Sequence, residues 1–186
     1  MKITLLSNIK IFNKHRIIIL ALLISILLFL NQMNLINKLL SNNNVLGNVD
    51  SIEKFKTGII SLVYIFQFII TFITIGLETF LICIITKILY KKTNPLKVFL
   101  EPIMISNIMC LIVNYSLLPL FGTFQGIEEL KFRSILSPAN VLQPIVICYF
   151  LSKKNIIPKT IIDWLKTGVI YIVVICVPAI ILFVLV

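Results

Sequence analysis

Long apolar runs separated by short polar segments dominate this chain. A membrane-spanning helix needs about 20 apolar residues to cross a hydrocarbon core about 30 Å thick, and its backbone polar groups must be satisfied within the helix. Five runs approach this length, so the pattern predicts an all-α, polytopic transmembrane helical bundle that forms a single domain. The predicted spans cover residues 17–36, 58–80, 98–120, 135–151 and 168–186.

The second run is unusually long, because apolar residues continue from position 58 to position 86. At 1.5 Å per residue this is about 43 Å of helix, too long for a perpendicular crossing. Either the helix is strongly tilted, or the span ends near Glu78 and the helix continues along or beyond the membrane surface. The second interpretation is favoured, since residues 59–78 already supply about 20 residues.

Prolines mark the predicted beginnings and bends of the later helices. Glu101 and Pro102 are expected in the first turn of the third span, where a carboxylate and a proline are both tolerated. Pro138 is expected at the first helical position of the fourth span. Pro144 and Pro178 are expected to kink the fourth and fifth helices.

Composition supports a lipid environment. Hydrophobic residues make up 59% of the 186 residues and charged residues only 13%, against about 25% charged in soluble domains. A soluble core of this size could not enclose so many apolar side chains, so the lipid bilayer is the first predicted partner. The net charge of +10 does not indicate nucleic acid, because the basic residues lie in short segments between apolar runs.

The distribution of lysine and arginine predicts the orientation. The N-terminal segment and the predicted second and fourth loops hold twelve of these residues, and the first and third loops hold five. Because cytoplasmic loops are enriched in positive charge, the N-terminus is expected inside and the C-terminus outside. The first span is expected to be an uncleaved anchor. The bias toward Ile, Asn, Lys and Phe indicates a bacterial cell membrane.

No residue pattern predicts catalysis or a bound cofactor. The four cysteines are far apart in the sequence, which does not favour a metal or redox site. The segment 128–133 has the EExxxR form of the first motif of intramembrane CAAX-type proteases. Those enzymes also need histidines on later helices, whereas this chain has only His15. The chain is therefore expected not to be an enzyme.

Glu78 is the one acid within a long apolar run, and ionisable residues inside membranes are functional candidates by default. It could bind a cation or a proton, or it could lie at the cytoplasmic interface and pair with Lys87 or Lys91; the interfacial interpretation is favoured. Asn107 and Asn114, seven residues apart, share one face of the third span. They could join helices or line a polar path.

Four lysines in two short loops are candidates for contacts on the cytoplasmic side: Lys91, Lys92, Lys153 and Lys154. They could bind anionic lipid headgroups or a cytoplasmic partner protein. Charge alone does not choose between these ligands.

The layout resembles the Yip1-like membrane domain of bacteria. The most similar stretch is residues 81–120, where a basic loop containing Asn94-Pro95 precedes a span that ends in Tyr115-Ser116-Leu117-Leu118-Pro119. A second similar stretch runs from Ser137-Pro138 to Trp164. The glycine-rich character of that family is missing, since the chain has 6 glycines. The resemblance implies accessory membrane proteins without catalysis, some of them linked to export or antimicrobial-peptide transport.

The expected function is therefore a non-enzymatic accessory subunit of an ABC-type export system, or a protein of bacteriocin transport or immunity. Its partner would be an ABC transporter permease or ATPase, or a second copy of the chain. The alternative is a small transporter or channel that uses Glu78. Burial of Glu78 among helices with polar neighbours would favour that alternative.

Overall fold

The structure is a computed structural model that describes residues 2–41, 49–117 and 138–185, with side chains described over 15–34, 61–117 and 141–175 and at positions 58 and 138. These residues form helices joined by short loops, without a strand. The helices are α1 (Lys2–Ser41), α2 (Val49–Tyr90), α3 (Lys97–Leu117), α5 (Pro138–Lys153) and α6 (Ile161–Leu185).

Three helical stretches in the described residues are long and apolar enough to cross a membrane: His15–Asn34, Ser61–Tyr90 and Lys97–Leu117. The all-helical prediction is confirmed to this extent. Helix α5 is shorter, at 16 residues, and begins at Pro138 as predicted. Ser137, the residue before it, lies outside the described residues, as do segment 128–133 and the whole of the predicted third loop.

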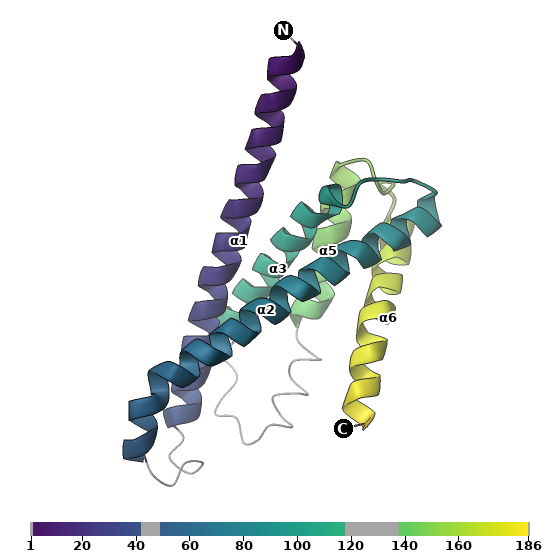
Figure 1. The fold of residues 1–186 in the computed structure, drawn as a ribbon. Helices are drawn as coiled ribbons and strands as arrows, with labels where there is room; N and C mark the ends of the chain where they lie inside the picture. The colour runs from purple at the N-terminus through teal and green to yellow at the C-terminus, as the bar shows by residue number, and fades with distance from the viewer. Residues whose placement is uncertain (1, 42–48, 118–137, 186) are drawn as a thin grey trace.

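Helix α3 is the central element, since it contacts α1, α2 and α5. Helix α2 crosses obliquely over α3 and α5, while α6 lies beside α5 and contacts α2 as well (Figure 1). The core forms where these helices meet, and its fully buried side chains include Ile24, Ile82, Phe99, Ile103 and Leu151. Every helix contributes to one cluster, which includes Tyr171 of α6.

The outward surface of the bundle is apolar. Large hydrophobic side chains such as Leu62, Phe66 and Ile73 of α2 are more than half exposed. The same is true of Leu22 and Ile26 of α1. Contiguous apolar surface of this extent is rare on soluble monomers, and it is the surface that contact with lipid tails requires.

Two short loops close the end of the bundle at which α2 and α5 finish. At the end of α2, Lys91 adopts a positive φ of 53°, and its N–H bonds to the Lys87 carbonyl at 3.0 Å. At the end of α5, Asn155 adopts φ 55°, while its N–H bonds to Ser152 and that of Ile156 to Leu151. The second pattern is a Schellman motif, which satisfies the last carbonyls of the helix.

Helix α6 begins at Ile161, seven residues before the predicted start of the fifth span. Thr160 caps it, because its hydroxyl accepts a hydrogen bond from the Asp163 N–H at 3.2 Å and donates one to the Asp163 carboxylate. This reciprocal arrangement is a form of capping box. Lys166, predicted to lie in a loop, is therefore helical.

Pro102 lies inside α3 and not in its first turn, so the prediction for Glu101 and Pro102 is wrong. The helix begins at Lys97 because the N–H groups of Val98 and Phe99 already bond to Pro95 and Leu96. Since proline has no N–H, Pro102 leaves the Val98 carbonyl without its helical partner. The Lys154 ammonium donates to that carbonyl at 3.2 Å.

Candidate functional site

A buried carboxylate with amide partners is the main polar feature inside the bundle. Glu78 of α2 is 6% exposed. Asn107 of α3 donates from Nδ2 to its Oε2 at 3.0 Å. Gln143 of α5 donates from Nε2 to both carboxylate oxygens, each at 3.0 Å. The carboxylate therefore joins three helices, and we call these three residues the Glu78 centre.

The Glu78 centre lies far from the helix ends. Asn107 is the midpoint of α3, ten residues from Lys97 and from Leu117, which places it about 15 Å from either end. Glu78 is likewise well inside the apolar stretch Ser61–Tyr90. The carboxylate thus occupies the middle of the apolar helices.

Tyr171 of α6 adds a fourth helix to this environment. Its side chain is 3% exposed, and its hydroxyl interacts with the Glu78 carboxylate without forming a close hydrogen bond. A buried phenol ordinarily finds a hydrogen-bond partner. Tyr171 is therefore a buried polar neighbour of the Glu78 carboxylate on the α6 side.

Most of the other buried polar side chains bond to their own helix, and Thr167 of α6 also bonds to the Tyr90 hydroxyl of α2 at 2.8 Å. Thr79, Thr86 and Ser106 bond to carbonyls three or four residues earlier on their own helices. Ser152 does the same on α5. These hydroxyl groups are therefore satisfied by backbone carbonyls of their own helix. Glu78 differs, since its hydrogen-bond partners come from other helices.

The predicted pairing of Glu78 with Lys87 or Lys91 is wrong. Lys87 is nine residues along the same helix, which is about 13 Å away along the axis, and both lysines are exposed whereas Glu78 is buried. The side chains that interact with the carboxylate are uncharged. Because α2 crosses α3 and α5 obliquely, the middle of the long apolar run meets the core.

The two asparagines of the third predicted span separate in the structure. Asn107 binds Glu78 and also donates to the Ile103 carbonyl at 3.0 Å, whereas Asn114 is exposed two turns further along α3. Seven residues are close to two helical turns, so the two side chains lie on nearly the same face, but Asn114 lies beyond the part of α3 that carries its buried residues. The shared helix face therefore did not place both residues in the site.

Gln143 and Tyr171 were not among the residues predicted from the sequence. Gln143 is the single amide within the apolar stretch around Pro144, so its position in a short run was an available signal. Tyr171 had no such signal, because a tyrosine in an apolar helix is typical of a membrane interface. Only the packing of α6 on α2 and α5 brings it to Glu78.

The predicted lysine contacts form a second polar region, at one end of the bundle. Lys154 binds Glu101 at 2.8 Å, and Arg16 of α1 lies 3.5 Å from the same carboxylate. Lys92 donates to the Asn155 carbonyl at 2.9 Å. We call this region the Glu101 cluster. It joins the beginning of the apolar stretch of α1, the loop after α2 and the loop after α5.

Lys91 and Lys153, the remaining predicted contact residues, are exposed at this same end. Lys91 provides the left-handed residue that ends α2, and Lys153 is the last residue of α5. A lysine near a helix C-terminus is favoured by the helix dipole. The favourable interaction of lysine with a helix C-terminus therefore explains part of the positive charge at this end of the bundle.

The Glu78 centre can hold a proton or a small cation. A buried carboxylate without a cationic partner is costly in its charged form unless hydrogen bonds or a bound ion compensate. The amide groups of Asn107 and Gln143 can rotate to present either N–H or oxygen, so they can serve an ionised carboxylate or its protonated form. Among described residues no group of three or more metal-ligating side chains occurs.

Comparisons with family models, with curated proteins and with solved structures find no match to this chain. The resemblance to the Yip1-like domain stays a prediction.

Proposed function

We propose that this chain is a small multi-pass membrane protein that transports or conducts an ion, with Glu78 as its proton- or cation-binding group. The observation that carries the proposal is a carboxylate buried at mid-helix, held by Asn107 and Gln143 and without a charged partner. Structural helix–helix contacts in membranes are made by small or neutral polar side chains. An ionisable group at this depth is maintained for chemistry that needs its charge.

The proposed topology has five spans in a bacterial cell membrane, with the N-terminus inside. Its support is the excess of Lys and Arg in alternate segments, together with the contacts of the Glu101 cluster. Arg16, Lys92 and Lys154 belong to the three segments that the charge count assigns to the cytoplasm, and they lie at the same end of the bundle. Labelling of Lys92→Cys from outside intact cells would contradict this topology.

The proposal is tested by ion flux in proteoliposomes. The purified protein is reconstituted with a pH-sensitive dye inside, and a potassium gradient with valinomycin imposes a membrane potential. Protons are expected to enter faster than in protein-free vesicles. Glu78→Gln keeps the shape of the side chain and one accepting oxygen but removes its charge, so it is expected to lower the flux by about tenfold or more.

Glu101→Gln is the matched control, since it makes the same change in a carboxylate of the same bundle, and its flux is expected to stay at the wild-type level. Sodium and potassium flux, followed with cation-sensitive dyes, identifies the ion when protons do not move. Equal flux of every ion for the wild type and Glu78→Gln rejects the role of Glu78.

The second candidate is a non-enzymatic accessory subunit of an ABC-type exporter. The observation that favours it is the exposed basic end, where Lys91 and Lys153 project outside the ion pairs of the Glu101 cluster. Mild-detergent purification from the native membrane followed by mass spectrometry distinguishes the candidates. A stoichiometric ATPase or permease that is lost in Lys91→Glu plus Lys153→Glu supports the subunit.

A further inference from the structure

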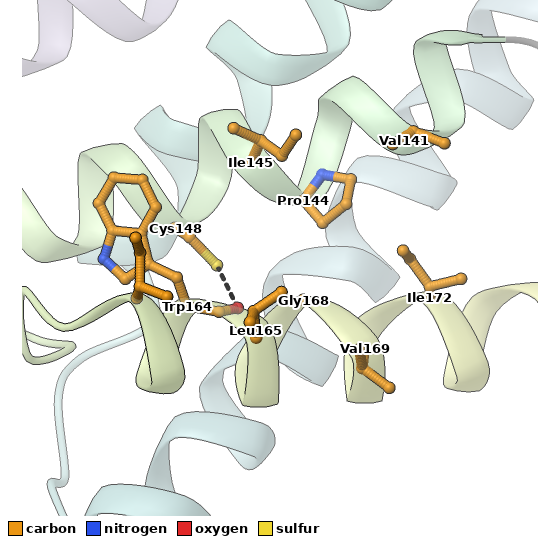
Figure 2. Close-up of a pocket in the computed structure, with 10 residues that line it drawn as sticks. Val141, Pro144, Ile145, Cys148, Trp164, Leu165, Gly168, Val169 and Ile172 are labelled. Atoms are coloured by element: carbon orange, nitrogen blue, oxygen red, sulfur yellow. Dashed lines mark hydrogen bonds between the residues drawn. The ribbon is translucent and has the colours of Figure 1, made fainter.

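An apolar groove runs between α5 and α6 (Figure 2). It has a volume of about 430 Å³, within the range of about 300–1,000 Å³ typical of ligand sites. Pro144 of α5 and Gly168 of α6 face each other across it; a Cβ at position 168 would lie 3.8 Å from the Pro144 Cβ. This is an ordinary van der Waals distance, so α5 and α6 approach each other closely at this point of the groove lining.

The length of the groove matches one leaflet of a bilayer. Its α6 side extends from Ile161 in the first turn to Ile172 near Tyr171. Eleven residues of helix span about 16 Å, and half of a hydrocarbon core is about 15 Å. The groove therefore begins at the loop end of the bundle and reaches the depth of the Glu78 centre.

Positive charge and aromatic rings gather at the loop end of the groove. Lys153 ends α5 and Lys159 precedes α6, and both are exposed, whereas Lys154 is engaged by Glu101. Tyr149 and Trp164 form an edge-to-face pair with ring centroids 6.4 Å apart. Lysines and amphipathic aromatic rings at this position are typical of the headgroup level of a membrane.

We propose that the α5/α6 groove is a binding site for an anionic phospholipid, with one acyl chain lying along the groove that Pro144 and Gly168 help to line and the phosphate beside Lys153 and Lys159. The apolar lining of the groove and its length, which is close to that of one leaflet, favour the binding of an acyl chain. The two lysines select a headgroup with net negative charge over a zwitterionic one. This site is separate from the Glu78 centre, so it does not depend on the proposed ion transport.

Trp164 provides a direct test, because it is the one tryptophan of the chain and it lines the groove. The full-length protein is reconstituted into phosphatidylcholine vesicles that contain either phosphatidylglycerol or phosphatidylcholine with brominated acyl chains, which quench tryptophan on contact. Brominated phosphatidylglycerol is expected to quench at lower mole fraction. Two lysines near an anionic headgroup correspond to a preference of about thirtyfold.

The double variant Lys153→Gln plus Lys159→Gln is expected to remove this preference while retaining quenching by both lipids. Lys97→Gln, at an exposed lysine outside the groove, is the matched control and is expected to keep it. Gly168→Leu fills the groove and is expected to reduce quenching by both lipids, with helical content checked by circular dichroism.

Two results would overturn the proposal. Equal quenching of the wild type by the two brominated lipids would show ordinary contact with surrounding lipid and no site. Absence of quenching by either lipid would show that protein covers the groove, either a second copy of the chain or another membrane protein.

Discussion

Glu78 and Glu101 are glutamates in the same bundle with opposite surroundings. The Glu101 side chain is 26% exposed and lies between the cations of Arg16 and Lys154. Glu78 is 6% exposed, and its hydrogen-bond partners are the neutral amides of Asn107 and Gln143. One carboxylate is compensated by charge near water, and the other is held by dipoles away from it.

This difference in surroundings is the basis for the function proposed for Glu78. Glu101 links segments that the chain must bring together at one end, and an exposed ion pair of this kind contributes little free energy. Glu78 retains a charge-bearing group where a leucine would pack at lower cost. A residue that lowers the stability of the fold in this way is a candidate for a role in activity.

The largest expected effect is a loss of ion flux when an amide partner of Glu78 is removed. Asn107→Leu removes one of the hydrogen bonds to the carboxylate and is expected to lower the flux in proteoliposomes by about tenfold, the equivalent of one hydrogen bond to a charged group. Asn114→Leu, on the same helix but exposed, is the control and is expected to have little effect. Equal losses in both variants would make α3 packing the cause and remove the distinction between the two glutamates.

The next effect is the coupling free energy of each carboxylate with its partner, measured by double-mutant cycles on unfolding in detergent. Glu78→Leu with Gln143→Leu is expected to give a coupling of about 1 kcal/mol, as for hydrogen bonds between membrane helices. Glu101→Gln with Lys154→Met is expected to give about 0.5 kcal/mol or less.

Salt sharpens this contrast. The Glu101–Lys154 coupling is expected to disappear in 1 M sodium chloride because exposed ion pairs are screened, while that of the Glu78 centre is expected to stay. A salt-sensitive Glu78 coupling would place that carboxylate in contact with water and contradict its burial.

A similar loss of stability is expected at the loop end from removal of a helix cap. Thr160→Ala deletes the hydroxyl that accepts from the Asp163 N–H, and it is expected to lower the free energy of unfolding by about 1 kcal/mol. Thermal unfolding followed by circular dichroism measures it, with Thr160→Ser as the conservative control. A smaller effect than that of Lys154→Met would mean that ion pairs, and not caps, fix this end.

The smallest expected effect is a gain in stability at Lys91. This residue has φ 53°, a conformation that disfavours side chains other than those of glycine and asparagine. Lys91→Gly is expected to raise the free energy of unfolding by about 0.5 kcal/mol. Asn155→Gly, at φ 55°, starts from a residue that already tolerates this conformation and is expected to change less. A loss of stability in Lys91→Gly would show that the lysine side chain contributes more than its backbone strain removes.

The helices could be predicted because apolar runs of this length have one way to satisfy their backbone in lipid. Pro138 at the start of α5 follows from its missing N–H and fixed φ. The start of α6 was harder to predict, since Thr160 and Asp163 form a cap within a segment whose lysines resemble a loop. Pro102 was misplaced because the first turn of α3 is set by backbone bonds to Pro95 and Leu96.

By itself, the sequence determined that the chain is helical and apolar, and that its charges lie between the apolar runs, since these properties depend on neighbours along the chain. Only the tertiary structure decided the partners of Glu78. Gln143 and Tyr171 are 65 and 93 residues away in the sequence, and the oblique crossing of α2 brings them to one point. The sequence places Glu78 a few residues before a group of lysines, which is typical of a membrane interface. In the structure, the surroundings of its carboxylate are instead set by the helices that pack against it.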